Sequence, residues 1–223
     1  MIFASKSPYR LSLLGGGSDL DWFVNQYGHG LSIGCAINKA SYVIIGHRPD
    51  GSQRGILNYS SREEYMGLNT ISHPIIRKTF ERFNIDEPVE LTSFGEAPNG
   101  SGLGGSSSFT VALVRSIYTL KSMDASNEEI ANIACDIEIN DLKKPIGRQD
   151  QYLSALGGVR LLQFLPDGTV KSLSLACHGE TLKTFCESLI LVHTGVVRSA
   201  DVVLSKIATD APSTVPLIKA IRD

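Results

Sequence analysis

The segment Glu96-Ala-Pro-Asn-Gly-Ser-Gly-Leu-Gly-Gly-Ser-Ser-Ser108 decides the fold of this chain. It follows a predicted strand at residues 89–94 and leads into residues 109–121, whose apolar residues have helical spacing. Its glycines let backbone N–H groups approach an anion without obstruction by a Cβ atom. The helix that follows adds unpaired N–H groups and the positive end of a dipole. A strand, a glycine-rich turn and a helix in this order predict a cradle for polyphosphate, in which a serine hydroxyl can also ligate Mg²⁺.

Two other interpretations compete with the phosphate cradle. An exposed flexible loop is the plain alternative for any stretch rich in glycine and serine. Gly100, Gly102 and Gly105 also match the dinucleotide-binding pattern G-x-G-x-x-G, which is a weak signal by itself. That fold needs a second strand after the helix, whereas a turn and another predicted helix follow here. The Gly-Lys-Ser/Thr of a Walker loop and the His-Arg-Asp and Asp-Phe-Gly signatures of protein kinases are absent from the sequence.

The rest of the pattern predicts a mixture of strands and helices. Residues 1–14 are predicted as extended, residues 15–19 as a turn and residues 33–47 as strands, with a further run ending near residue 59. Helical spacing covers residues 73–83 and 126–142, and Ser126 with Glu129 forms a capping box. The elements predicted after them are a loop at 148–152, strands at 159–164, 170–175 and 189–193, and a helix at 200–207. Because strands and helices do not alternate regularly, the predicted class is α+β.

Composition excludes several classes of protein. The 223 residues, 42% hydrophobic and 20% charged, are typical of a globular protein with one large or two modest domains. A net charge of −2 provides no field that would recruit nucleic acid or an anionic membrane. No apolar run is long enough for a membrane span, and no basic-flanked leader precedes the first strand. Because Cys35, Cys135, Cys177 and Cys186 form no C-x-x-C pair, reduced thiols in a cytoplasmic protein are expected.

Three segments resemble one family of enzymes. Pro98-x-x-x-Gly-Leu-Gly-x-Ser106-Ser resembles the phosphate-binding motif of the galactokinase, homoserine kinase, mevalonate kinase and phosphomevalonate kinase (GHMP) superfamily. The segment Pro8–Asp19, with its three glycines, resembles the first motif of that superfamily, and Pro145–Tyr152 resembles the segment that carries its catalytic Asp. The Gly-x-Gln-Asp-Gln form and the segment His193–Arg198 are similar to the branch of D-glycero-D-manno-heptose 7-phosphate kinases and bacterial fucokinase-like domains.

The resemblance implies a fold and a reaction. Residues 1–180 are expected to form an N-terminal domain like domain 2 of ribosomal protein S5, which binds ATP and sugar. Residues 181–223 are expected to begin a ferredoxin-like C-terminal domain. The implied activity is ATP- and Mg²⁺-dependent phosphorylation of an alcohol group on a small molecule. The expected acceptor is D-glycero-D-manno-heptose 7-phosphate at its anomeric hydroxyl, and the alternative is a free fucose- or galactose-like sugar.

Site residues follow from the motifs and from the chemistry of phosphoryl transfer. Asp150 is the candidate base, and Arg10 is the candidate for stabilising charge on the transferred phosphoryl group. The resemblance implies that Glu138 ligates Mg²⁺ together with Ser106, although Asp136 and Asp141 lie close enough to be alternatives. The residues expected to cradle the nucleotide phosphates are Pro98, Gly100, Gly102, Leu103, Gly104, Gly105, Ser106 and Ser107.

Fewer chemical requirements identify the residues that bind the acceptor than those that bind the nucleotide. Asp19 is expected to bind a sugar hydroxyl, and Gly16 and Gly17 are expected to let the backbone approach the sugar. Arg148 and Arg198 are candidates for binding a phosphate already on the substrate, because arginine binds phosphate in a bidentate way. A turn aspartate and solvated or structural arginines are the corresponding alternatives.

One departure from the superfamily affects these expectations. The third, glycine-rich motif of the superfamily is not found before Asp223, where the chain stops within a predicted helix. An apolar surface is therefore expected where the rest of the second domain packs. The absence of the third motif also leaves open a second class of function, a nucleotide- or sugar-binding fragment that lacks activity.

Overall fold

A single sheet organises the chain in the computed structural model, which describes residues 1–98, 100–176, 179–192 and 210–223. In this part of the chain the sheet has seven strands in the order β4-β3-β5-β2-β6-β7, and β1 pairs with β2. The β3–β5 pair is parallel and the other pairs are antiparallel. The strands are β1 (Ile2–Leu14), β2 (Gly30–His47), β3 (Gly55–Asn58), β4 (Arg62–Tyr65), β5 (Val89–Gly95), β6 (Val159–Phe164) and β7 (Val170–Ser174).

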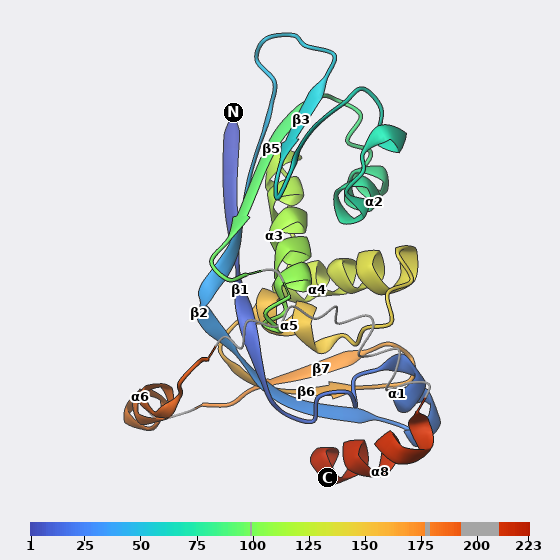
Figure 1. Cartoon of the computed structure of the whole chain (residues 1–223), viewed down its shortest axis with the longest axis vertical. Coiled ribbons are helices and arrows are strands. Elements are labelled where there is room, and N and C mark those ends of the chain that lie inside the picture. Colours follow the sequence, from blue (N-terminus) through green and yellow to red (C-terminus); the bar gives the residue numbers. More distant parts are fainter. Residues whose placement is uncertain (99, 177–178, 193–209) are drawn as a thin grey trace.

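The long strand β2 runs through the sheet and changes partner along its length (Figure 1). Its last residues, Ser41–His47, pair with β5, whereas its first residues, Gly30–Cys35, pair with β6. Between these pairings, the Ala36 N–H donates to the Gly158 carbonyl, and the Ala40 N–H donates to the Glu96 carboxylate. The glycine-rich segment therefore leaves β5 at the level where β2 changes partner.

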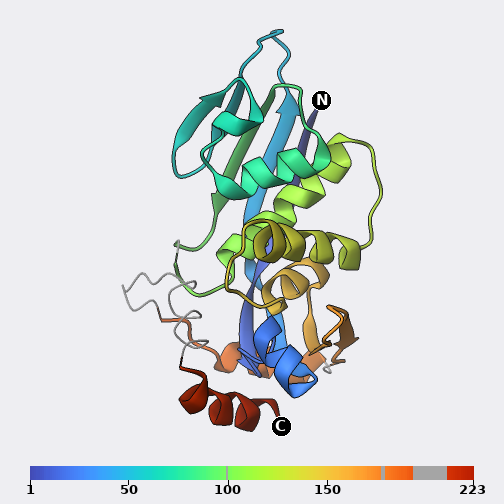
Figure 2. The same cartoon turned by 90° about the vertical axis from the view of Figure 1, so that its right-hand side faces the viewer.

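Helices cover one face of this sheet, as Figure 2 shows when the molecule is turned by 90°. Val43, Ile45 and Leu91 from the strands are buried against Leu113 and Ile117 of the central helix. These helices are α2 (Pro74–Phe83), α3 (Gly105–Leu120), α4 (Asn127–Cys135) and α5 (Gln149–Leu156). The short helix η1 (Leu68–Thr70) precedes α2, and a π-helical turn, η2 (Asp136–Asp141), continues α4.

The α+β class is confirmed, and so are most of the elements predicted before residue 176. Helix α2 begins after His73, whose ring accepts a hydrogen bond from the Ile76 N–H at 3.4 Å, and Pro74 occupies the first helical position. Helix α4 begins after Ser126, whose hydroxyl accepts from the Glu129 N–H at 3.1 Å. The helix predicted from residue 126 to 142 changes to π-helical geometry at Asp136.

The loop predicted at residues 148–152 is wrong, because residues Gln149–Leu156 form helix α5. Pro145 and Gly147 do end the preceding helix, but a new one starts almost at once. The Asp19 carboxylate accepts a hydrogen bond from the Gln149 N–H at 3.1 Å and so caps the helix from a distant segment. Tyr152 and Leu153 then bury the helix against the core.

The strand predicted at residues 189–193 is also wrong over the residues that the structure describes. Residues 189–192 have no regular structure and follow helix α6 (Gly179–Ser188). Their apolar side chains are exposed, Ile190 by 86%, so they have no sheet to pack against. His193 and the helix predicted at 200–207 lie outside the described residues. The exposed apolar side chains in this part of the chain agree with the expected apolar surface: Leu182, Phe185, Leu189, Ile190, Leu191, Val192, Leu217 and Ile221.

Two more helices lie near the opposite end of the sheet from α2 (Figure 1). Helix α1 (Asp21–Tyr27) buries Phe23 together with Leu20, and helix α8 (Ala211–Arg222) adds Ile218 to that cluster. No helix in the described ranges is long and apolar enough to cross a lipid bilayer.

Candidate active site

The first turn of α5 connects the predicted site residues. Gln149, Asp150 and Gln151 are consecutive, and each contacts a different segment. The Gln149 N–H donates to Asp19, the Asp150 carboxylate accepts from Arg10, and the Gln151 side chain donates to Glu138. A carboxylate at this position is also stabilised by the positive end of the helix dipole. The structure therefore brings Asp19, Arg10 and Glu138 together at one helix N-terminus.

Arg10 and Asp150 form a bidentate ion pair. Arg10 Nε donates to Asp150 Oδ1 and Arg10 Nη2 donates to Oδ2, both at 2.6 Å. The pairing of β1 with β2 shifts register between Pro8 and Arg10, as in a β-bulge, and such irregularities re-aim side chains. With side-chain exposures of 14% and 22%, both groups are partly shielded and still reach solvent.

The glycine-rich segment lies directly against this ion pair. The Arg10 N–H donates to the Leu103 carbonyl at 3.1 Å, and Arg10 Nη1 donates to the Gly102 carbonyl at 2.7 Å. Gly104 has a φ of +73° and is the N-cap of α3, where no side chain caps the helix. A Cβ atom on Gly104 would lie 3.1 Å from Arg10 Cγ and 3.2 Å from Asp150 Oδ2. The anion-binding end of α3 and the candidate base therefore meet at Gly104.

The predicted metal pair, Ser106 and Glu138, is also in contact. Ser106 Oγ donates to Glu138 Oε1 at 2.6 Å, and Gln151 Nε2 donates to Glu138 Oε2 at 2.8 Å. Lys144 Nζ donates to Ser106 Oγ at 2.8 Å and to Glu138 Oε1 at 2.9 Å. A hydroxyl and a carboxylate are oxygen donors of the kind that Mg²⁺ prefers, and Mg²⁺ often takes its other ligands from phosphates and water. The donor set fits Mg²⁺ bound together with a nucleotide.

The alternatives to Glu138 face away from this site. Asp136 and Asp141 both pair with Arg82 on α2, at 3.5 and 3.3 Å. Glu138, between them in sequence, is fully buried and points to Ser106. The structure describes no cluster of three or more His, Cys, Asp or Glu side chains that could hold a metal ion, so protein ligands alone do not build a closed metal site in these residues.

Asp19 is a buried carboxylate whose charge is unfavourable. It accepts from the Gly17 N–H and the Gln149 N–H, both at 3.1 Å, and Gly147 packs so closely that a Cβ there would overlap the carboxylate. The pKa of Asp19 is raised from 3.8 to about 6, mainly by burial and also by the neighbouring Asp150, while the N–H donors partly oppose the rise.

Asp19→Asn is expected to remove a pH-dependent part of the stability. Because the pKa of Asp19 is about 6 in the folded chain and 3.8 ordinarily, the folded state binds more protons between these values. Its contribution is therefore full below pH 3.8 and is lost as the pH rises through about 6, by about 3 kcal/mol in total. The unfolding free energy of the variant minus that of the parent, from urea titrations, should rise by about this amount between pH 3 and pH 7. A constant difference over that range would contradict the assignment.

The structure gives less direct support for several residues that were predicted to bind the substrate. Arg148 pairs with Asp21, Nε to Oδ1 at 3.1 Å, and contacts the Gly168 carbonyl at 3.5 Å. Gly16 lies beside Gln149, and Gly17 lies beside Ile218 of α8. Arg198 lies outside the described residues. Within the nucleotide segment, Leu103 and Ser107 are buried, whereas Pro98, Gly100, Gly105 and Ser106 are exposed.

Sequence reasoning missed three residues that the structure places in the site. Lys144 and Gln151 contact Glu138, and the Gln149 side chain accepts from Ser12 at 2.9 Å on the acceptor side. No hydrophobic periodicity in the sequence distinguishes these three residues from their neighbours. The signal available was position, because Lys144 comes just before Pro145 and the two glutamines flank Asp150.

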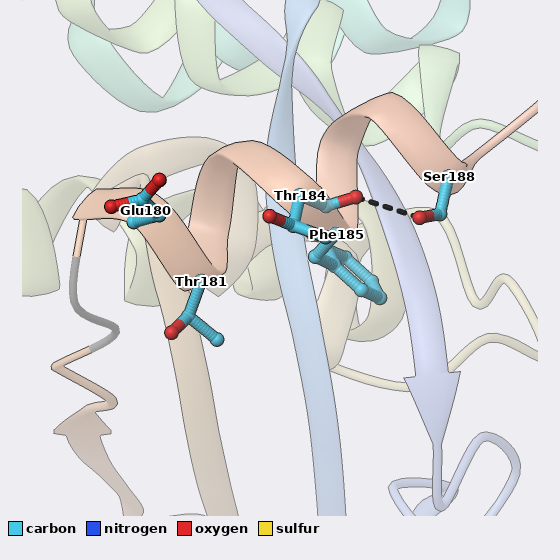
Figure 3. Close-up of a pocket in the computed structure, with 5 residues that line it drawn as sticks. All are labelled: Glu180, Thr181, Thr184, Phe185 and Ser188. Carbon is cyan, nitrogen blue, oxygen red and sulfur yellow. Dashed lines mark hydrogen bonds between the residues drawn. The ribbon is translucent and has the colours of Figure 1, made fainter.

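A separate hollow lies along α6 (Figure 3). Within it, Ser188 Oγ donates to the Thr184 carbonyl at 2.7 Å. None of the candidate site residues lines it, so it is not the site described above; its lining residues are Glu180, Thr181, Thr184, Phe185 and Ser188.

Comparisons with known proteins agree with the motifs. Residues 69–158 match the family described as "GHMP kinases N terminal domain". The D-glycero-alpha-D-manno-heptose 7-phosphate kinase of Campylobacter jejuni is 29% identical over 172 residues, which are 72% of this chain and 50% of that protein. The galactokinase of Clostridium beijerinckii is 26% identical over 180 residues, 74% of this chain and 44% of that protein. The chain thus spans half or less of the length of these two curated relatives.

A solved structure supports the same resemblance. The crystal structure of a D-glycero-D-manno-heptose 1-phosphate kinase from Bacteroides thetaiotaomicron superposes with a TM-score of 0.72 at 29% identity. The match covers 80% of this chain and 61% of the other. The resemblance predicted from the three motifs is confirmed.

Proposed function

We propose that this chain, whose residues 69–158 match the GHMP kinase N-terminal domain family, transfers the γ-phosphoryl group of ATP to a hydroxyl group of a sugar or sugar phosphate. The proposal rests on the contact between the candidate base and the helix N-terminus that is suited to phosphate. The Arg10–Asp150 ion pair lies against Gly104, the N-cap of the helix whose first turn is suited to phosphate. A base and a phosphate cradle in contact are what phosphoryl transfer needs.

The proposed reaction assigns a step to each of these groups. The acceptor hydroxyl forms a bond to the γ-phosphorus, while the bond from that phosphorus to the bridging oxygen breaks and ADP leaves with the electron pair. Asp150 accepts the proton of the hydroxyl, and the Arg10 guanidinium holds the carboxylate in position and offsets negative charge near the phosphoryl group. Ser106 and Glu138 would hold Mg²⁺, which supplies charge neutralisation on the phosphates when bound.

For the acceptor, we propose D-glycero-D-manno-heptose 7-phosphate, phosphorylated at the anomeric hydroxyl. Support comes from the names of the Campylobacter relative and the Bacteroides structure, each 29% identical to this chain. Gly16, Gly17 and Asp19 are proposed to face the sugar, and Arg148 and Arg198 are proposed to bind its phosphate. The galactokinase relative favours a second candidate, a free sugar. A fragment that binds without turnover is the remaining alternative, because the chain spans half of the first relative.

The acceptor phosphate can be tested by comparing two acceptors that differ only there. We expect kcat/KM to be about tenfold or more higher for the heptose 7-phosphate than for the free heptose, because a charge-assisted hydrogen bond contributes about 1.5–3 kcal/mol. Product identity by ³¹P NMR then identifies the hydroxyl that is phosphorylated. Equal kcat/KM values for the two acceptors would favour the free-sugar candidate instead.

The organisation and location of the protein are further proposals. A domain boundary near residue 180 is supported by the position of α6 and α8 outside the sheet. A cytoplasmic location is supported by Cys35, Cys135 and Cys186, which are free thiols within the described ranges.

A further inference from the structure

Lys144 is a cation placed between the two residues proposed to hold Mg²⁺. Its Nζ lies 2.8 Å from Ser106 Oγ and 2.9 Å from Glu138 Oε1, and those two oxygens are themselves 2.6 Å apart. The backbone supports this placement, because the Lys144 N–H donates to the Glu138 carbonyl at 3.0 Å. The ammonium group therefore contacts both oxygens of the Ser106–Glu138 pair at once.

The ammonium group also neutralises a charge that has no other cationic partner in the part of the chain that the structure describes. Glu138 is fully buried, whereas the Lys144 side chain is 19% exposed. The other donors to the carboxylate, Ser106 and Gln151, are neutral. A buried carboxylate without a counter-charge is strongly unfavourable, so the site needs a cation at all times.

From this geometry we infer that Lys144 is the built-in counter-cation of the metal site: it excludes divalent cations from the nucleotide-free protein and moves to the nucleotide phosphates when Mg²⁺ arrives with them. The inference rests on the proposed nucleotide-dependent function. An ion bound by both Ser106 Oγ and Glu138 Oε1 would have to share the position of the ammonium group. Metal binding alone would therefore bring two positive groups together and release none.

A bound nucleotide changes this balance. Its phosphates carry several negative charges, which attract both Mg²⁺ and an ammonium group. Lysine is suited to such a move, because its charge is compact and sits on a flexible four-carbon stem. Ser106 lies in the first turn of α3, so a phosphate at that helix N-terminus comes close to Lys144 without a change in the backbone. Divalent-cation binding becomes dependent on the nucleotide as a result.

The test is a titration with Mn²⁺, followed by electron paramagnetic resonance, of the full chain with and without a non-hydrolysable ATP analogue. The unmodified chain should bind Mn²⁺ about tenfold or more tightly when the analogue is present. Lys144→Gln should bind Mn²⁺ without the analogue, about tenfold or more tightly than the unmodified chain does. Lys143→Gln is the matched control, because Lys143 is exposed one position away, and it should behave like the unmodified chain.

Two outcomes test the role of Lys144, and a third tests the proposed function. Equal Mn²⁺ affinity of the unmodified chain with and without bound analogue would overturn the role of Lys144, and this arm needs no variant. Equal Mn²⁺ affinity of folded Lys144→Gln and the unmodified chain, both without analogue, would overturn it as well. Failure of the unmodified chain to bind the analogue at all, measured separately by calorimetry, would instead remove the proposed kinase function on which the inference rests.

Discussion

Asp150→Asn is expected to lower turnover by about 10²–10⁴-fold, the range typical for loss of a general base, and to leave ATP affinity nearly unchanged. The amide cannot accept the proton of the acceptor hydroxyl. It also cannot form the two charged hydrogen bonds that Arg10 donates at 2.6 Å. ATP affinity should persist because the phosphate cradle is built from the loop and the N-terminus of α3, which the substitution leaves intact. The measurement is steady-state ADP release beside a direct ATP-binding titration.

Asp124→Asn is the matched control for this variant. Asp124 is exposed in the turn before α4, and the same change of charge there should leave both quantities unaltered. A melting temperature close to that of the parent shows that the Asp150 variant is folded. Unchanged turnover in a folded Asp150→Asn protein would remove this carboxylate from the proposed role.

Gly104→Val is expected to weaken nucleotide binding by about a hundredfold or more. A β-branched residue is a strong outlier at a φ of +73°, and such strain costs on the order of 1–3 kcal/mol. Its Cβ would also lie 3.1 Å from Arg10 Cγ and 3.2 Å from Asp150 Oδ2, so the ion pair must shift. Both effects act at the N-cap of α3, where the phosphates are proposed to bind. Calorimetric titration with a non-hydrolysable ATP analogue measures the loss.

Gly28→Val separates backbone strain from the effect on the site. Gly28 has a φ of +84°, and nothing lies within 4 Å of a Cβ added there. This variant should lose stability but keep its affinity for the nucleotide. Normal nucleotide affinity in folded Gly104→Val would count against the assignment of the glycine-rich segment.

Candidates for the site residues can be chosen from the sequence because they lie in compact motifs. Ser106, Asp150 and Arg10 each belong to a segment whose residue types match the needs of phosphate and proton transfer. Their contacts could not be predicted in the same way. Arg10 and Asp150 are 140 positions apart, and no local pattern states that a bulge in β1 faces the first turn of α5.

The errors have physical causes of the same kind. Residues 148–152 were predicted as a loop because Pro145 and Gly147 break the preceding helix, but a carboxylate 130 positions away caps a new one at Gln149. Residues 189–192 form a short apolar run, for which strand and other structure cannot be separated by periodicity. At Gln149 a long-range hydrogen bond allows a helix to begin. At residues 189–192 no sheet is present to pack against among the described residues, and the chain has no regular structure there.

The most direct test of the central claim is release of ADP by this 223-residue chain with ATP and Mg²⁺, measured across a panel of sugars and sugar phosphates. The account predicts ADP release that depends on the acceptor, is strongest with the heptose 7-phosphate, and falls by about 10²–10⁴-fold in Asp150→Asn. Binding of ATP without turnover on any acceptor of the panel would contradict the kinase assignment and favour a protein that binds nucleotide without transferring phosphate.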